Sequence, residues 1–331
     1  MIDLKQLLLD LAKRDCIGCV TSAADYAAEV LSPFCEIKRL SGNSFYALLK
    51  GNGEKTVLFD AHIDQIGFIV TEVCDGFLRV DKVGNPDVRV LPSTPVNIHT
   101  KDGIKPGVFC NTPPHLKKEE GKAPDISEIF IDTLGDNSAS VGDFVTFYDT
   151  PVCLLGNRVA SRSLDNRAGV AALIFAAFML KEKNLKNDIV FLFSDGEELG
   201  LRGAKTAAFG IDAACAVVTD VSFGDSPSSP KHKTSPLGSG AMIGISPVLS
   251  YEKSMALCKL AERENIPFTK EVVGGTTSTN ADVIGITNAG IPTALISIPL
   301  RNMHTASEVV DIADIEAVAK LFYYFALEEE K

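Results

Sequence analysis

Histidines and acidic residues of the kind that bind divalent metals stand at the ends of apolar segments in this 331-residue chain. Five of them stand out: His62, Asp165, Glu198, Asp220 and His304. Imidazole and carboxylate ligands without cysteine fit Zn, Co or Mn rather than a structural zinc site. A carboxylate can also bridge two ions, because each of its oxygens can bind one of them. The five residues form the ligand set that a two-metal hydrolase requires.

Each of these residues taken alone has an ordinary structural interpretation. A histidine at a strand end, such as His62, is more often structural, and Asp165 could cap the helix predicted from residue 164. The acidic segment 195–198 could be a solvated turn. Charge at the end of a buried strand is nevertheless costly unless it is paired or bound to metal. Because chance placement of all five residues is improbable, the joint pattern favours a metal site.

The elements that must position these residues alternate between strand and helix. Apolar, strand-like runs lead into His62, Glu198 and Asp220, and in open α/β sheets functional sites gather at the carboxyl ends of strands. Adjacent glutamates point in different directions from an extended backbone. One of Glu197 and Glu198 can therefore bind a metal while the other reaches a water bound to it. Helices are predicted at residues 4–11, 23–31, 164–183, 201–209, 251–265 and 312–326.

The segment 69–155 differs from the rest of the chain. Short alternating runs, such as 77–80, 88–90 and 144–147, are separated by Gly, Pro and Asp, and no amphipathic helix of useful length is visible. This pattern predicts an all-β insert. The expected fold is a mixed-sheet α/β catalytic domain, made of residues 1–68 and 156–331, with an inserted β domain at 69–155.

The composition of the chain argues against some classes of partner and favours one cellular compartment. A net charge of −11 argues against a nucleic-acid footprint or an anionic-membrane partner, both of which need clustered Lys and Arg. The longest apolar stretch, residues 168–180, is far below the roughly 20 residues that span a bilayer. We see no export signal, and the cysteines lie mostly in apolar runs, so a cytoplasmic protein is expected. Cys16 and Cys19 have redox or zinc spacing but no second pair, which favours two thiols in a turn.

Five ordered motifs resemble the signatures of one enzyme family, the tetrahedral, deblocking or glutamyl-type aminopeptidases, which are dinuclear metallopeptidases. The similarity covers nearly the whole chain, including the β insert. The motifs are Ala-His-Ile-Asp-Gln-Ile-Gly-Phe at 61–68, Leu-Asp-Asn-Arg-Ala-Gly at 164–169, Glu-Glu-Leu-Gly-Leu-Arg-Gly-Ala at 197–204, Asp220, and Ile-Pro-Leu-Arg-Asn-Met-His-Thr at 298–305.

The resemblance implies a two-metal aminopeptidase that removes N-terminal residues from peptides. Its two ligand sets would share one carboxylate: His62, Asp165 and Asp220 in the first, and Asp165, Glu198 and His304 in the second. Glu197 would be the general base, and Asp64 would support His62. The resemblance also implies a cis peptide bond after Asp165, zinc as the expected metal with cobalt or manganese as alternatives, and a dimerising β insert. Such dimers commonly assemble into tetrahedral dodecamers.

The chain departs from the family pattern at four positions without losing a ligand. Gln65 stands where a glutamate is usual, Asn166 where a second aspartate is common, and Asn280 where an aspartate is usual. Asp195 makes the stretch before the paired glutamates more acidic than usual. Gln65 and Asn280 bear mainly on substrate preference, and Asp195 on the proton environment of Glu197.

Three other functions are compatible with parts of the pattern. A carboxypeptidase, deacylase or dipeptidase of the same clan could use these ligands, but such enzymes usually carry their extra domain after the catalytic glutamates. A glycosidase could use paired carboxylates yet has no need of His62 and His304. A non-enzymatic assembly protein could retain a vestigial site. The preferred N-terminal residue, the native metal and the choice of dimer or dodecamer are left open by the sequence.

Overall fold

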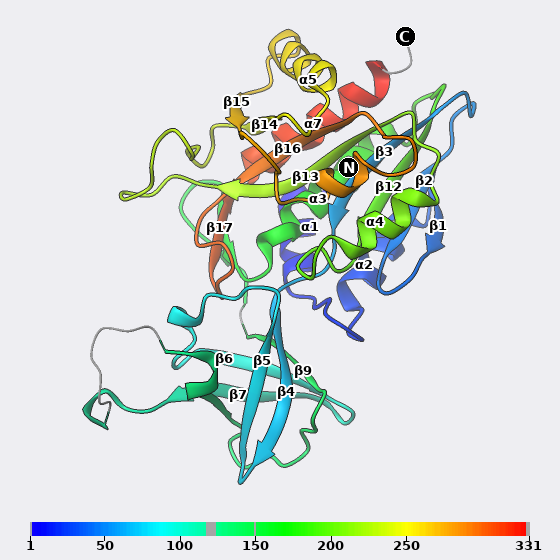
Figure 1. The fold of residues 1–331 in the computed structure, drawn as a ribbon. Helices are drawn as coiled ribbons and strands as arrows, with labels where there is room; N and C mark the ends of the chain where they lie inside the picture. The colour runs from blue at the N-terminus through cyan, green and yellow to red at the C-terminus, as the bar shows by residue number, and fades with distance from the viewer. Residues whose placement is uncertain (1, 117–123, 149, 329–331) are drawn as a thin grey trace.

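The computed structural model describes residues 2–116, 124–148 and 150–328, which form two bodies. The larger is an α/β body that contains both ends of the chain, and the smaller is a β-barrel that lies below it in Figure 1. Within the described ranges, no helix is both long and apolar enough to cross a membrane.

An eight-stranded mixed sheet forms the centre of the α/β body. The four central strands, β12, β3, β13 and β16, are parallel. β2 pairs antiparallel with both of its neighbours, whereas β14 pairs antiparallel with β16 and parallel with β15. Parallel strands covered on both faces are nearly continuous in apolar residues, which explains their run-like sequences. In spatial order the strands are β1 (Glu36–Arg39), β2 (Phe45–Leu49), β12 (Asp188–Ser194), β3 (Thr56–His62), β13 (Cys215–Phe223), β16 (Thr293–Leu300), β14 (Ala241–Ile245) and β15 (Phe268–Val272).

Helices cover both faces of this sheet. The more extensive core contains residues of α1 (Leu4–Ala12), α2 (Ser22–Leu31), α3 (Leu164–Leu180), α5 (Tyr251–Arg263) and α7 (Ile312–Glu328). The opposite face packs against α4 (Arg202–Phe209) and α6 (Ala281–Ile284). Helix α3 lies between the sheet and α1, α2 and α7. Because it is surrounded by protein, it is apolar around its whole circumference.

Six strands close the smaller body into a barrel, as an all-β insert requires. Its interior is a separate hydrophobic core, in which Phe68 packs edge-to-face on Phe109 and Phe147 with ring centroids 4.8 and 5.7 Å apart. The mixed α/β fold with an inserted barrel is therefore confirmed. Around the barrel the strands are β4 (Gly67–Cys74), β5 (Phe77–Val83), β8 (Ile129–Asp132), β7 (Gly103–Asn111), β6 (Pro95–Thr100) and β9 (Phe144–Phe147).

Two local elements differ from the sequence prediction. Val88–Val90, predicted as a strand, is a 3₁₀ turn because the side chain of Asp87 accepts a hydrogen bond from the Arg89 amide and caps it. A short strand inside the predicted insert, β10, pairs with β11 rather than with a barrel strand. It belongs to a three-stranded sheet made of β10 (Val152–Cys153), β11 (Arg158–Ser161) and β17 (Glu308–Asp311).

A buried polar cluster around Asp15 joins the two bodies. Asp15, which follows α1, accepts hydrogen bonds from Arg162 and from Nε2 of Gln65, the latter at 3.1 Å. From the barrel, His99 Nε2 lies 3.6 Å from Asp15 Oδ2 and 3.0 Å from the Thr146 hydroxyl. Burial would raise the pKa of Asp15, but the Arg162 guanidinium outweighs it and the pKa is lowered. This carboxylate therefore stays charged at the junction.

Asp15→Asn is expected to lower the free energy of unfolding by about 3–5 kcal/mol, because it leaves Arg162 charged and buried. The matched control is Asp25→Asn, which removes an exposed pair with Arg39 and costs about 0–1 kcal/mol. Urea titration of both variants measures this. Because the folded pKa of Asp15 is lowered, its contribution is present above the unfolded value of 3.8 and declines as pH falls below it. Equal losses in both variants at neutral pH would contradict the assignment.

Candidate metal centre

The structure brings all five predicted ligands to the carboxyl edge of the sheet. His62 ends β3, Glu198 follows β12, Asp220 lies near the end of β13, and His304 follows β16. Asp165 lies at the start of α3. Their ligand atoms form two groups, each within 4.8 Å: His62, Asp165 and Asp220 in one, and Asp165, Glu198 and His304 in the other.

Asp165 stands between the two groups. Its Oδ1 lies 3.1 Å from His62 Nε2, and its Oδ2 lies 3.4 Å from His304 Nε2. The first imidazole nitrogen is also 3.5 Å from Asp220 Oδ1, and the second is 3.4 Å from Glu198 Oε1. Asp165 does not cap the helix, because Asn166 does: its Oδ1 accepts a hydrogen bond from the Gly169 backbone amide at 3.0 Å. The peptide bond between Asp165 and Asn166 is cis. Each oxygen of Asp165 thus serves a different group.

The donor set fits one divalent ion in each group. Each group offers one imidazole nitrogen and carboxylate oxygens, which are the ligands of catalytic zinc and related metals. Burial acts to raise the pKa of Asp165, but contact with His304 and His62 lowers it, so the shared carboxylate is charged. Burial raises the pKa of Asp220 and of Glu198. Cations here would offset the repulsion among these three buried acids.

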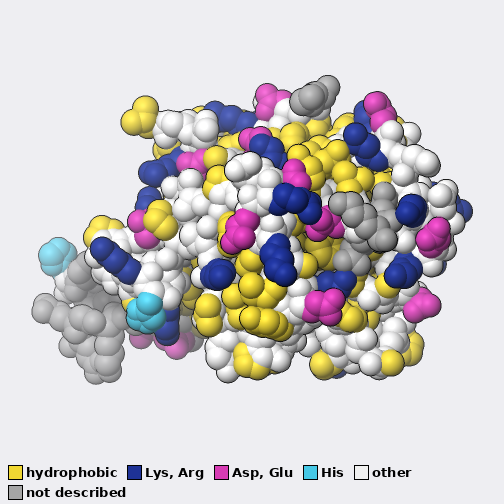
Figure 2. All heavy atoms as spheres, turned by 90° about the horizontal axis from the view of Figure 1, so that it is seen from above, with side chains coloured by type: hydrophobic (Ala, Val, Ile, Leu, Met, Phe, Trp, Pro, Cys, Tyr) yellow, Lys and Arg dark blue, Asp and Glu magenta, His cyan; other side chains and the backbone are white. Residues whose placement is uncertain are grey.

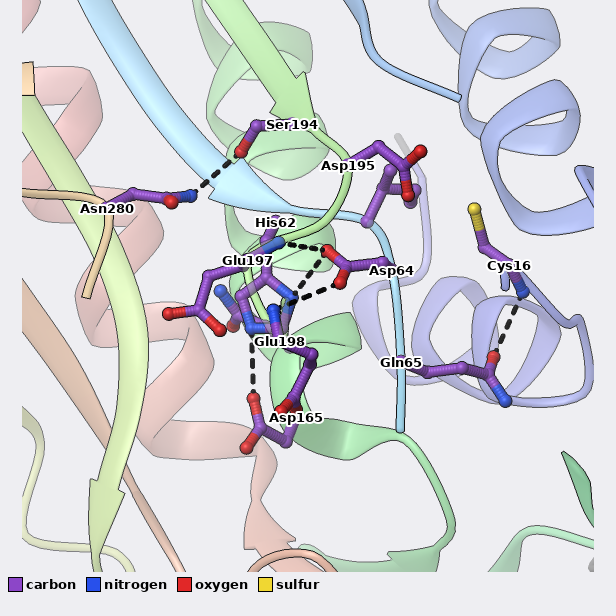
Figure 3. Close-up of polar contacts among 12 residues, drawn as sticks. Cys16, His62, Asp64, Gln65, Asp165, Ser194, Asp195, Glu197, Glu198 and Asn280 are labelled. Carbon is purple, nitrogen blue, oxygen red and sulfur yellow. Dashed lines mark hydrogen bonds and ion pairs between the residues drawn. The ribbon is translucent and has the colours of Figure 1, made fainter. Parts of the chain in front are cut away.

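Asp64 connects the first imidazole to the segment with the paired glutamates. Its Oδ1 lies 3.3 Å from His62 Nδ1, and its two oxygens accept hydrogen bonds from the amides of Glu197 and Glu198 at 3.1 and 3.2 Å. Figure 3 shows this carboxylate between the histidine and that backbone. One side chain therefore orients a ligand in each group, as carboxylates beside metal-bound histidines commonly do.

His304 is oriented by the loop between the barrel strands β5 and β6 and by an acid that the sequence analysis missed. Its Nδ1 lies 3.0 Å from the carbonyl oxygen of Asn85, which leaves Nε2 facing the carboxylates. Glu308 accepts a hydrogen bond from the His304 amide at 2.9 Å and another from the Asp165 amide at 3.0 Å. A signal was present in the sequence, since Glu308 opens a short apolar run four residues after the histidine.

Glu197 lies beside the ligands but belongs to neither group. Burial, together with the nearby carboxylates of Asp220 and Glu198, raises its pKa to about 9, although His62 acts in the opposite direction. Gly196 before it has a φ of 71°, a conformation that glycine adopts readily, so the chain turns sharply between β12 and the two glutamates. A carboxyl group in this environment can hold a proton at neutral pH.

Gln65 has a neutral side-chain amide, where a glutamate carboxylate is usual in the family, and this amide forms three hydrogen bonds. Its Oε1 accepts from the Arg167 guanidinium at 2.9 Å and from the Cys16 amide at 3.0 Å, while its Nε2 donates to Asp15. Arg167 is fully buried and also donates to the carbonyl of Ile63, next to His62. Gln65 therefore acts in the support of the site.

The other three departures also have structural partners. Asn280 donates from Nδ2 to Asp60 and Ser194, both at 2.8 Å, and Figure 3 shows it beside Ser194. Asp60 was not singled out in the sequence, and burial raises its pKa to about 7.

Asn166 donates a hydrogen bond to the Thr219 carbonyl at 2.9 Å and so connects α3 to β13. Asp195 accepts from the Asn43 amide at 2.9 Å, and burial raises its pKa.

Cys16 and Cys19 are not joined by a disulfide, and neither belongs to a ligand group found among the described residues. Cys16 is buried and Cys19 is exposed, and both are free thiols. Ile17 and Val20 form an antiparallel bridge around the turn. Burial raises the pKa of Cys16 to about 12, so its thiol stays protonated at neutral pH.

Comparison with known proteins identifies the family. The model of the M42 glutamyl aminopeptidases matches residues 42–321. The chain belongs to the M42 family. A lysyl aminopeptidase of Pyrococcus furiosus is 31% identical over 300 residues, which cover 86% of this chain and 85% of that protein. As an M42 member, the protein is an aminopeptidase, a metallopeptidase that removes N-terminal residues from peptides.

Two solved structures extend the likeness to the M42 fold as a whole. The aminopeptidase APDkam598 of Desulfurococcus kamchatkensis has a TM-score of 0.91 at 28% identity, covering 98% of this chain and 94% of that one. The TET1 peptidase of Pyrococcus horikoshii, which can assemble into a tetrahedron or a large octahedral shell, has a TM-score of 0.86 at 29% identity. That match covers 98% of this chain and 99% of the other.

Gly203→Ala is expected to destabilise the segment that carries the paired glutamates. A Cβ at Gly203, in the first turn of α4, would lie 2.2 Å from the carbonyl oxygen and 2.6 Å from the amide nitrogen of Asp195. Overpacking of this kind costs about 1–3 kcal/mol. Gly210→Ala, at the other end of α4, is the control, because its nearest contact would be 3.6 Å. Chemical denaturation that shows no difference between the two variants would refute the close approach.

Proposed function

We propose that the aminopeptidase works with two divalent metal ions, one in each ligand group. His62 and Asp220 would hold the first, Glu198 and His304 the second, and Asp165 both. The observation that carries this proposal is the placement of Asp165, whose two oxygens face different imidazoles. Bound ions would supply a Lewis acid for the scissile carbonyl and lower the pKa of a bound water. Zinc is the metal we favour, with cobalt or manganese as alternatives.

Glu197 acts as general base in this proposal, and Asp64 positions it. The Glu197 carboxylate takes a proton from the attacking water and passes it to the leaving amine of the peptide. Two bound cations would lower the pKa of this carboxyl group, so that it starts the reaction as a carboxylate. Its burial beside other acids gives it the proton affinity to carry the proton to the leaving amine. The hydrogen bonds from Asp64 fix the backbone of both glutamates, so base and ligand keep their relative positions.

We further propose that residues 69–155 form a dimerisation domain and that dimers build a larger closed assembly. Large apolar side chains exposed on the barrel, such as Ile104, Leu134 and Val141, support a partner surface there. The TET1 relative assembles into closed shells.

Peptides are the expected substrates. In Figure 2, basic and acidic side chains are interspersed on the visible face, which supports the expectation that nucleic acid is not a partner.

The cytoplasm is the compartment we propose for this enzyme. All eight cysteines are free thiols, and Cys16, Cys35, Cys215 and Cys258 are buried. Free cysteines persist in a reducing compartment, whereas oxidising ones favour disulfides.

Glu197→Gln is expected to lower kcat on an aminoacyl p-nitroanilide by about 10²–10⁴-fold, which is the usual contribution of a general base. The amide is isosteric, so metal content and the unfolding midpoint should match those of the wild type. Glu182→Gln, at an exposed position, is the control and should keep full activity. The measurements are steady-state kinetics and metal analysis by inductively coupled plasma mass spectrometry. Wild-type turnover in the metal-loaded Glu197 variant would exclude this base.

A further inference from the structure

A second acidic side chain lies on the sheet beside the metal centre, outside both ligand groups. Glu271, on β15, accepts hydrogen bonds from the hydroxyl of Ser222 on β13 and from that of Ser297 on β16, the latter at 2.7 Å. Its register partner on β14 is Gly244, which has no side chain. The glutamate can therefore extend across β14 and reach the central strands.

The strand register places this carboxylate next to the first ligand group. Ser297 is the direct partner of Asp220 in the β13–β16 ladder, and Ser222 lies two residues beyond Asp220 on the same face. Neighbouring strands are about 4.8 Å apart, and two residues span about 7 Å along a strand. The Glu271 carboxylate is thus about one strand away from Asp220, on the face that carries the ligands.

Glu271 is partly buried and has neutral hydroxyl groups rather than a cation as its partners. Ser222 and Ser297 are buried, at 7% and 1% exposure, whereas Glu271 keeps part of its surface accessible. Among the residues that the structure describes, no lysine, arginine or histidine forms an ion pair with Glu271. Two buried hydroxyls aimed at one carboxylate hold it in a fixed position and leave its negative charge uncompensated.

We propose that Glu271 recognises the cationic side chain of a lysine or arginine at the substrate N-terminus. The inference rests on the proposed function, because the scissile carbonyl must lie at the metal centre. From that point the four-carbon stem of lysine can span the width of one strand to Glu271. An acidic N-terminal side chain would be repelled there, and a neutral one would leave the carboxylate without a counter-charge.

The substrate α-ammonium group is the other cation that Glu271 could meet. That group is separated from the scissile carbonyl by a single carbon, so it stays at the ligands themselves. The Asp220–Ser297 strand spacing separates Glu271 from that point. The register therefore favours the side chain over the α-ammonium group.

A pair of matched substrates distinguishes these two roles. Lysyl and norleucyl p-nitroanilide share the same carbon stem and α-ammonium group and differ in the terminal amine. We expect the metal-loaded wild type to cleave the lysyl substrate with at least about tenfold higher kcat/KM. Glu271→Gln, which retains the hydrogen-bonding shape, should lower the lysyl-to-norleucyl ratio by about 10–100-fold, as expected for loss of a charged hydrogen bond. Glu262→Gln, exposed on α5, is the control and should keep the wild-type ratio.

Separate outcomes test the inference and the proposed function. A lysyl-to-norleucyl ratio that is unchanged in Glu271→Gln would overturn the inference. If that ratio is unchanged because kcat/KM falls equally on both substrates, Glu271 contacts the α-ammonium group instead. Calorimetric titration of L-lysine and L-norleucine into each metal-loaded variant gives a second readout, and only lysine should bind more weakly to Glu271→Gln. If the metal-loaded wild type cleaves neither substrate yet Glu197→Gln binds metal normally, the proposed function fails instead.

Discussion

The central constraint on this protein is the concentration of negative charge around one bridging aspartate. Asp165 is buried between two imidazoles, and Glu198, Asp220 and Glu308 lie close by. Buried like charges repel strongly unless a cation or hydrogen-bond donors compensate them. The histidines and backbone amides supply part of that compensation, and divalent ions would supply the rest. The surrounding fold holds these groups together in spite of their repulsion.

Both bodies of the fold contribute to that support. The loop between the barrel strands β5 and β6 provides the Asn85 carbonyl that orients His304, and β3 of the α/β body leads to His62 and Asp64. Asp15, which follows α1, contacts Arg162 of the α/β body and His99 of the barrel and, through Gln65, is connected to Arg167. The metal centre therefore depends on the position of the barrel as well as on the sheet. An insert placed after β3 can in this way support the metal centre as well as the proposed assembly.

The sequence predicted the buried strands of the sheet, because burial requires apolar residues there. The parallel strands that carry or precede His62, Glu198 and Asp220 are largely apolar, so their extent and the positions of these polar residues were visible in the sequence. Contacts made by single side chains across long sequence distances were not. Glu308 and Glu271 resemble ordinary solvent-facing acids in an alternating strand, and only the register shows that they reach Asp165 and Ser297. Val88–Val90 was misjudged because the Asp87 cap overrides the strand preference of valine.

Anomalous diffraction from crystals of the zinc-loaded enzyme tests the central claim most directly. We expect two zinc peaks per subunit, one bound by His62 and Asp220 and the other by Glu198 and His304, with a different oxygen of Asp165 bound to each. A single peak at saturating zinc, or peaks with Asp165 turned away from them, would contradict it.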